Sequence, residues 1–130
     1  VQVIGGPVVV PDDRVREISA AAGVEAGRIA GADRYATGAA VARALLAADN
    51  FGFGGRVWVA SGANFPDALA GGPAIDRERG LLLLVPPSGA LPSSVADVAQ
   101  LSDGSRVAVL GGTVAVSDAM ADQVADAVAR

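Results

Sequence analysis

The stretch VAVLGGTVAVSD, residues 107–118, carries the pattern that decides the fold. Its first four residues are apolar, as in a buried strand, and two glycines follow them. Ser117 then precedes a run with apolar residues at Met120 and Val124, so it stands where a serine caps a helix. A strand that passes through a glycine turn into a helix is the basic unit of an α/β fold.

The same pattern opens the chain. Residues 1–12 read VQVIGGPVVVPD and match residues 107–118 at seven of twelve positions, at an offset of 106. This offset exceeds the roughly 20 to 50 residues of solenoid repeats, so each repeat should be a domain. We expect residues 1–27 to be the strand and helix that end a preceding repeat, packed against residues 28–130, which form one complete repeat. Residue 1 is valine and no signal-peptide pattern follows it, so we expect a part of a longer or processed protein.

Five short β-branched or leucine-rich runs alternate with helical patterns. These runs are Val1–Ile4, Arg28–Ala30, Val57–Ala60, Leu81–Val85 and Val107–Leu110. Strands separated by helices favour parallel pairing, because parallel strands need long right-handed crossovers. The sequence therefore predicts an α/β fold with an open, mainly parallel sheet of about five strands and helices on both faces, a three-layer sandwich of the Rossmann or toprim kind.

The expected helices have recognisable ends. Asp33 and Ser117 precede two of them as caps, and Pro66 suits the first position of a third. Three glycines fall where helices should stop in a left-handed conformation, namely Gly23, Gly80 and Gly104.

Composition excludes several classes of function. The 130 residues, 52% hydrophobic, are enough for one core, and they include no histidine, cysteine or lysine. The chain therefore lacks Ser-His and Cys-His nucleophiles, the usual zinc ligands and a phosphate-loop lysine. The net charge is −4 and the ten basic residues, all arginine, are scattered, which argues against nucleic-acid binding. No apolar run approaches the ~20 residues of a membrane span.

Ligands of open parallel sheets bind beyond the carboxyl ends of the strands, where loops lead into helices. The polar and glycine-rich segments 31–34, 61–67, 86–89 and 111–113 are expected there. Free backbone N–H groups and helix dipoles suit such loops to anions. Two interpretations stay open for the glycine pairs, which either allow a tight turn or contact a ligand, and for Arg34, which either binds phosphate or pairs with a carboxylate.

The acidic and hydroxyl residues of these loops also have structural roles open to them. Asp33 and Asp67 stand at helix starts, where a cap or dipole partner is the commoner role than an acid catalyst. Ser61 has no histidine to activate it, which argues against a nucleophile. A metal site remains open if the loops of Asp33, Asp67 and Asp118 converge.

Four segments together resemble a known family. RIAGADRYAT (28–37), ASGANFPDAL (60–69), LLLVP (82–86) and VLGGTVAVS (109–117) closely resemble the cell-wall-binding repeat of type two, in the family's order and spacing. The resemblance implies a non-catalytic module, without cofactor or metal, that anchors secreted Gram-positive proteins at the cell wall and cell surface. It implies non-covalent binding to an anionic secondary cell-wall polymer, teichoic-acid-like or polysaccharide, usually by three copies of the repeat.

The resemblance also suggests site residues. The anchoring segment of the family, Ile-Leu-Leu, corresponds to residues 82–84, with leucine in place of isoleucine. Because one full repeat is present, a threefold assembly requires further copies, in tandem or as a homotrimer. From loop position and motif match we expect the ligand-binding residues to be Arg28, Arg34, Ser61, Asn64, Asp67, Leu82, Leu83, Leu84, Gly111, Gly112 and Thr113.

Two other functions compete with this one. One is an enzyme acting on phosphate or sugar substrates through Asp33, Asp67 and the glycine-rich loops. The other is a structural spacer whose loops bind nothing.

Overall fold

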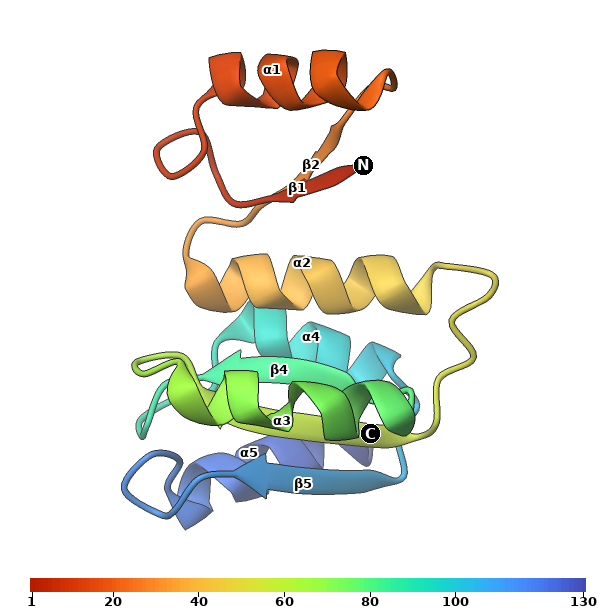
Figure 1. Ribbon diagram of the computed structural model, residues 1–130. Helices are drawn as coiled ribbons and strands as arrows, with labels where there is room; N and C mark the ends of the chain where they lie inside the picture. The colour runs from red at the N-terminus through yellow and green to blue at the C-terminus, as the bar shows by residue number, and fades with distance from the viewer.

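The computed structural model describes all residues from Val1 to Arg130 and contains five strands and five helices in strict alternation (Figure 1). The elements are β1 (Gln2–Ile4), α1 (Asp12–Ala22), β2 (Gly27–Ile29), α2 (Arg34–Leu46), β3 (Arg56–Ser61), α3 (Pro66–Arg77), β4 (Leu81–Val85), α4 (Ser93–Leu101), β5 (Arg106–Leu110) and α5 (Asp118–Val128). The alternation of strands and helices along the chain and the α/β class are as the sequence predicts.

All strand pairs are parallel, but the strands form two sheets. The larger has the order β4-β3-β5, and the smaller consists of β1 and β2. In this respect the structure differs from the single sheet of about five strands expected from the sequence. Helix α2 follows β2 and packs along β4, so it lies between the small sheet and the edge of the large one (Figure 1).

The large sheet is the middle of a three-layer body. Helix α3 covers one face, and α4 and α5 pack together on the other (Figure 1). The core lies on the α4–α5 side, where the alternate residues Leu81, Leu83 and Val85 of β4 are fully buried. Helix α5 contributes Met120 and Val124, both without exposed surface.

The small sheet and α1 form a separate unit at the N-terminal end of the molecule (Figure 1). None of the residues of α1 is buried, and the unit's buried hydrophobic residues are Val3 and Ala26. This unit therefore has little core of its own.

Helix ends partly follow the sequence prediction. The side chains of Asp33 and Ser117 accept hydrogen bonds from the backbone as N-caps, and Pro66 begins α3. Gly23 is left-handed as expected, with φ of 67°.

At the other two helix ends the prediction was wrong by one residue. The left-handed residues are Arg79 and Asp103, each directly before the predicted glycine. Gly80 is required by packing instead, because a Cβ atom there would lie 2.6 Å from the indole ring of Trp58.

No helix has both the length and the apolar character that crossing a membrane requires.

Candidate functional site

Parallel strands place every strand-to-helix loop at one edge of the molecule, the left edge in Figure 1. Loops from both sheets therefore meet there, although the sheets themselves are separate. This is the edge at which ligands of parallel α/β proteins bind.

A cleft of about 660 Å³ opens at this edge, between the loop after β1 and the start of α2. Its volume falls within the range of small-ligand sites. The lining residues are Ile4, Gly5, Gly6, Pro7, Val8, Val9, Gly31, Ala32, Asp33, Arg34, Thr37, Gly38 and Leu84. We call this space the α2 cleft.

Arg34 is the cationic residue of the α2 cleft. Its Nη1 donates a hydrogen bond of 2.8 Å to the carbonyl oxygen of Gly62, which follows β3. This contact joins the β2–α2 loop to the β3–α3 loop and leaves the remaining guanidinium N–H groups without a partner in the chain. The sequence left two roles open for Arg34, binding a phosphate or pairing with a carboxylate. Arg34 forms no ion pair with a carboxylate in the structure.

The turn that presents Arg34 is fixed by neighbouring polar contacts. The N–H of Gly31 donates to Oγ1 of Thr37 at 2.9 Å, and the N–H of Ala36 donates to Oδ1 of Asp33 at 2.8 Å. A Cβ atom on Gly31 would lie 2.5 Å from the carbonyl carbon of Ala36, so only glycine fits here. The Asp33 carboxylate therefore acts as a helix cap.

The three leucines of β4 divide between its two faces. Leu83 is fully buried in the core, whereas Leu82 and Leu84 are partly exposed on the other face. Leu84 lies against Gly38 and lines the α2 cleft, and both it and Leu82 line a smaller groove beside α2. Leu84 is thus the leucine of this segment that a ligand in the α2 cleft would meet.

The β3–α3 loop contributes less to the cleft than expected. Ser61 is 1% exposed, and its hydroxyl oxygen accepts a hydrogen bond of 3.2 Å from the N–H of Ala63. Asn64 is exposed, and Asp67 lies in the first turn of α3. None of the three lines the α2 cleft.

Gly111, Gly112 and Thr113 are exposed in the loop after β5, outside the α2 cleft. Gly111 has φ of 101°, as Gly5 has φ of 124° at the equivalent position of the first copy. The first glycine of each pair is thus required by the turn.

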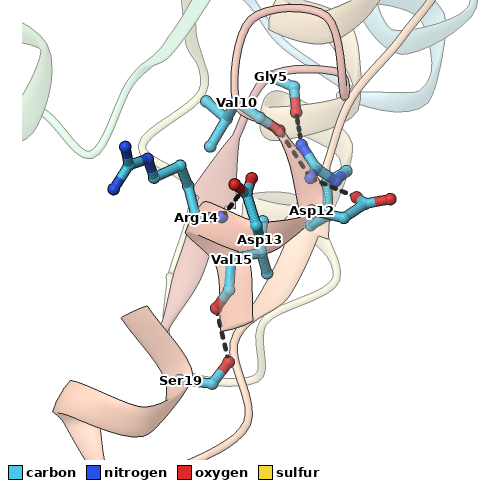
Figure 2. A network of polar contacts seen from close by, with 8 residues as sticks. Gly5, Val10, Asp12, Asp13, Arg14, Val15 and Ser19 are labelled. Carbon is cyan, nitrogen blue, oxygen red and sulfur yellow. Dashed lines mark hydrogen bonds and ion pairs between the residues drawn. The ribbon is translucent and has the colours of Figure 1, made fainter. Parts of the chain in front are cut away.

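Arg28 joins the small sheet to its own loop. Its guanidinium donates to the carbonyl oxygens of Gly5 at 2.5 Å and Val10 at 2.8 Å, and to Oδ1 of Asp12 at 2.9 Å. Figure 2 shows the three acceptors converging. We call this arrangement the arginine clasp. Its donors are directed into the chain, and contact of Arg28 with a ligand stays a prediction.

The structure does not bring the acidic residues together. No group of three His, Cys, Asp or Glu side chains is close enough to hold a metal ion, so the hypothesis of a site formed by Asp33, Asp67 and Asp118 is wrong. The aspartate that reaches the cleft, Asp33, is occupied as a cap.

Ligand contact was one of two open interpretations for the pair Gly5 and Gly6, which does line the α2 cleft. The lining residues that the sequence did not indicate are Ile4, residues 7–9, Thr37 and Gly38. The loop 5–9 belongs to the preceding βα unit, and no local pattern shows that it faces α2. The signal that could have indicated it is the repeat itself, because residues 111–113 were expected to bind ligand and residues 5–7 are their copy.

The parallel three-layer fold with a cleft at its strand ends is typical of α/β binding modules. The family model for cell wall binding domain 2 matches residues 28–121, and the chain belongs to that family. Its members bind the cell wall without catalysis, so the domain is a non-catalytic cell-wall-binding domain that associates with the cell wall or cell surface. This assignment removes the hypothesis of a phosphate- or sugar-directed enzyme.

Two solved structures have the same fold. Cwp6 from Clostridium difficile is 21% identical with a TM-score of 0.82, over 96% of this chain and 19% of that one. Cwp8 from Clostridium difficile is 20% identical with a TM-score of 0.76, over 97% of this chain and 20% of that one. The chain thus spans about a fifth of each. No curated protein matches its sequence.

Proposed function

We propose that this domain anchors a secreted protein non-covalently to an anionic secondary polymer of the cell wall, teichoic-acid-like or polysaccharide, and that the α2 cleft is the contact. The single observation that carries the proposal is Arg34. Arg34 lines a cleft of about 660 Å³ at the start of a helix, and only one of its guanidinium N–H groups has a partner in the chain.

The chemistry of the cleft suits a phosphate- or carboxylate-bearing sugar chain. A guanidinium presents several N–H donors in a planar fork that matches these anions. The positive end of the α2 dipole adds to the attraction. Besides Asp33, which caps α2, and Thr37, the lining consists of glycines and apolar residues, and Val8 and Val9, 96% and 79% exposed, offer surface to sugar rings.

The net negative charge of the domain opposes binding to an anionic polymer. A net charge of −4 repels a polyanion at long range, so attraction must come from local contacts. One such site is weak. Further copies of the repeat, in tandem or as a homotrimer, would raise avidity by orders of magnitude if each contacts the same polymer.

The experiment is co-sedimentation of the domain with purified walls, with Arg34→Ala as the test variant. Arg16→Ala is the matched control, because Arg16 is exposed on α1, outside the α2 cleft. Loss of a charge-assisted contact of about 1.5–3 kcal/mol lowers affinity roughly 10- to 150-fold. We expect this loss for Arg34→Ala alone.

Equal binding by wild type and both variants would exclude the α2 cleft as the contact. If the wild type binds no wall preparation, the domain alone is not an anchor and the spacer hypothesis gains support.

A further inference from the structure

Gly62 is a neighbour of the α2 cleft that does not line it. The residue directly follows β3, and its carbonyl oxygen accepts the hydrogen bond of 2.8 Å from Nη1 of Arg34. A Cβ atom on Gly62 would also lie 3.4 Å from Cβ of Leu84, the leucine that lines the cleft. Gly62 therefore borders two of the lining residues and acts on a ligand only through them.

The backbone of Gly62 is attached to the large sheet. Its N–H donates to the carbonyl of Val85, the last residue of β4, at 2.8 Å. Ser61, directly before it, is 1% exposed, and its hydroxyl oxygen accepts a hydrogen bond of 3.2 Å from the N–H of Ala63, directly after it. The carbonyl that Arg34 meets is thus held by the body of the domain.

Space, and not backbone conformation, requires glycine at position 62. Gly62 is not among the residues with positive φ, so its backbone suits any residue. A Cβ atom there would lie 2.5 Å from Cε1 and 3.1 Å from Cδ1 of Tyr35. The ring of Tyr35 is partly buried and packs against the core. A side chain at position 62 would therefore displace this ring, or the start of α2 with it.

Tyr35 directly follows Arg34 in the first turn of α2. The ring of Tyr35 packs on Gly62 while the guanidinium of Arg34 donates to the Gly62 carbonyl, so two consecutive residues use the same point of the β3–α3 loop. The turn before them is tightly packed as well, because Gly31 lies against the first turn of α2. A displaced ring would therefore move the backbone that carries Arg34.

We propose that Gly62 is a positioning residue for ligand binding, because its carbonyl and its lack of a side chain together hold the guanidinium of Arg34 in one orientation before a ligand arrives. The proposal rests on the α2 cleft as the contact with the anionic polymer. A long side chain that is already ordered loses less conformational entropy on binding, which raises affinity roughly 2- to 12-fold.

A double-mutant cycle in the co-sedimentation assay with polymer-bearing walls tests the proposal. Gly62→Ala should lower affinity roughly 2- to 12-fold in the wild-type background. In the Arg34→Ala background it should lower affinity less than about twofold, because no guanidinium remains to be positioned. Ala63→Ser is the matched control, since it adds one atom to the next residue of the same loop, which is exposed and outside the cleft. It should bind as the wild type does.

A second substitution shows whether the effect passes through Tyr35. Tyr35→Val lacks the two ring atoms that a Cβ atom at position 62 would meet. In the Tyr35→Val background, Gly62→Ala should therefore lower affinity less than about twofold. Equilibrium denaturation of each variant separates lost binding from lost folding.

Proton exchange of the arginine side chains, followed by ¹⁵N NMR, measures the positioning without any ligand. In the wild type, the Nη1 protons of Arg34 should exchange roughly 2- to 12-fold more slowly than those of Arg16, the factor expected from one hydrogen bond. Arg16 is the reference because it is exposed on α1. Gly62→Ala should abolish the difference, and Ala63→Ser should leave it unchanged.

Equal losses of affinity from Gly62→Ala with and without Arg34 would overturn the proposal, because a merely structural residue acts in both backgrounds. A loss that Tyr35→Val does not relieve, or Arg34 protons that exchange as fast as those of Arg16 in the wild type, would also overturn it. These results leave the α2 cleft standing as the contact. Unchanged wall binding by Arg34→Ala would instead remove the contact itself, and with it any ligand for Gly62 to serve.

Discussion

Replacing Arg28 with alanine should open the N-terminal unit while leaving the body of the domain intact. The guanidinium is well covered, with 22% of the side chain exposed, and donates to two backbone carbonyls and one carboxylate. The variant leaves the carbonyls of Gly5 and Val10 without their charged donor.

The magnitude follows from these contacts. Hydrogen bonds to charged groups contribute about 1.5–3 kcal/mol, and partial access of water to this loop reduces each to roughly 1–1.5 kcal/mol. The ion pair with Asp12 adds at most about 0.5 kcal/mol, because the carboxylate is 72% exposed. The total is about 2–3.5 kcal/mol, which corresponds to a roughly 30- to 350-fold rise in the open population.

The opening should be local, because the unit has almost no core. In native-state hydrogen exchange the Gly5 and Gly27 amides, which hold β1 to β2, should lose protection by that factor. Amides of β3, whose Val57 and Val59 are fully buried, should be unaffected. Asp12→Asn is the control and should change exchange about twofold at most.

Two results would refute this reasoning. Unchanged protection at Gly5 would mean that the clasp contributes nothing to stability. An equal loss of protection in β3 would mean that the unit and the body unfold together, in spite of their separate sheets.

Three further substitutions test the structure by equilibrium denaturation. Asp33→Ala removes the cap of α2 and should cost about 1 kcal/mol, largely restored by serine at the same position. Met120→Ala leaves a cavity in the core and should cost about 2–5 kcal/mol, whereas Arg14→Ala, at the equivalent position of exposed α1, should stay within ~0.5 kcal/mol. Gly111→Ala places a side chain on a residue with φ of 101°, a conformation that strains any residue but glycine, and should lower the free energy of unfolding by about 1–3 kcal/mol. Gly112→Ala, where a Cβ atom would have nothing within 4 Å, should lower it by ~0.5 kcal/mol or less.

The elements of the fold were predictable because each has a local signal. The run Leu81–Val85 is the observed β4 to the residue, and the caps at Asp33 and Ser117 are where the sequence indicates. Strand partners were not predictable in the same way. Hydrophobic periodicity shows which residues are buried, and it carries no information on which strand lies alongside another, so the division into two sheets was missed.

The α2 cleft shows the same limit. Arg34 and Leu84 were expected at the site and line it. The loop 5–9, which forms the opposite wall, comes from another βα unit and reaches α2 only through the tertiary arrangement. The clasp of Arg28 depends on carbonyl oxygens that every residue possesses, so no residue type marks it in the sequence.

The most direct test of the central claim is co-sedimentation of the domain with purified walls, before and after chemical removal of the anionic secondary polymer, at low and moderate salt. Binding that disappears with the polymer, and that Arg34→Ala weakens, is the result that we expect. Equal binding to intact and stripped walls would contradict it and assign recognition to the peptidoglycan that remains.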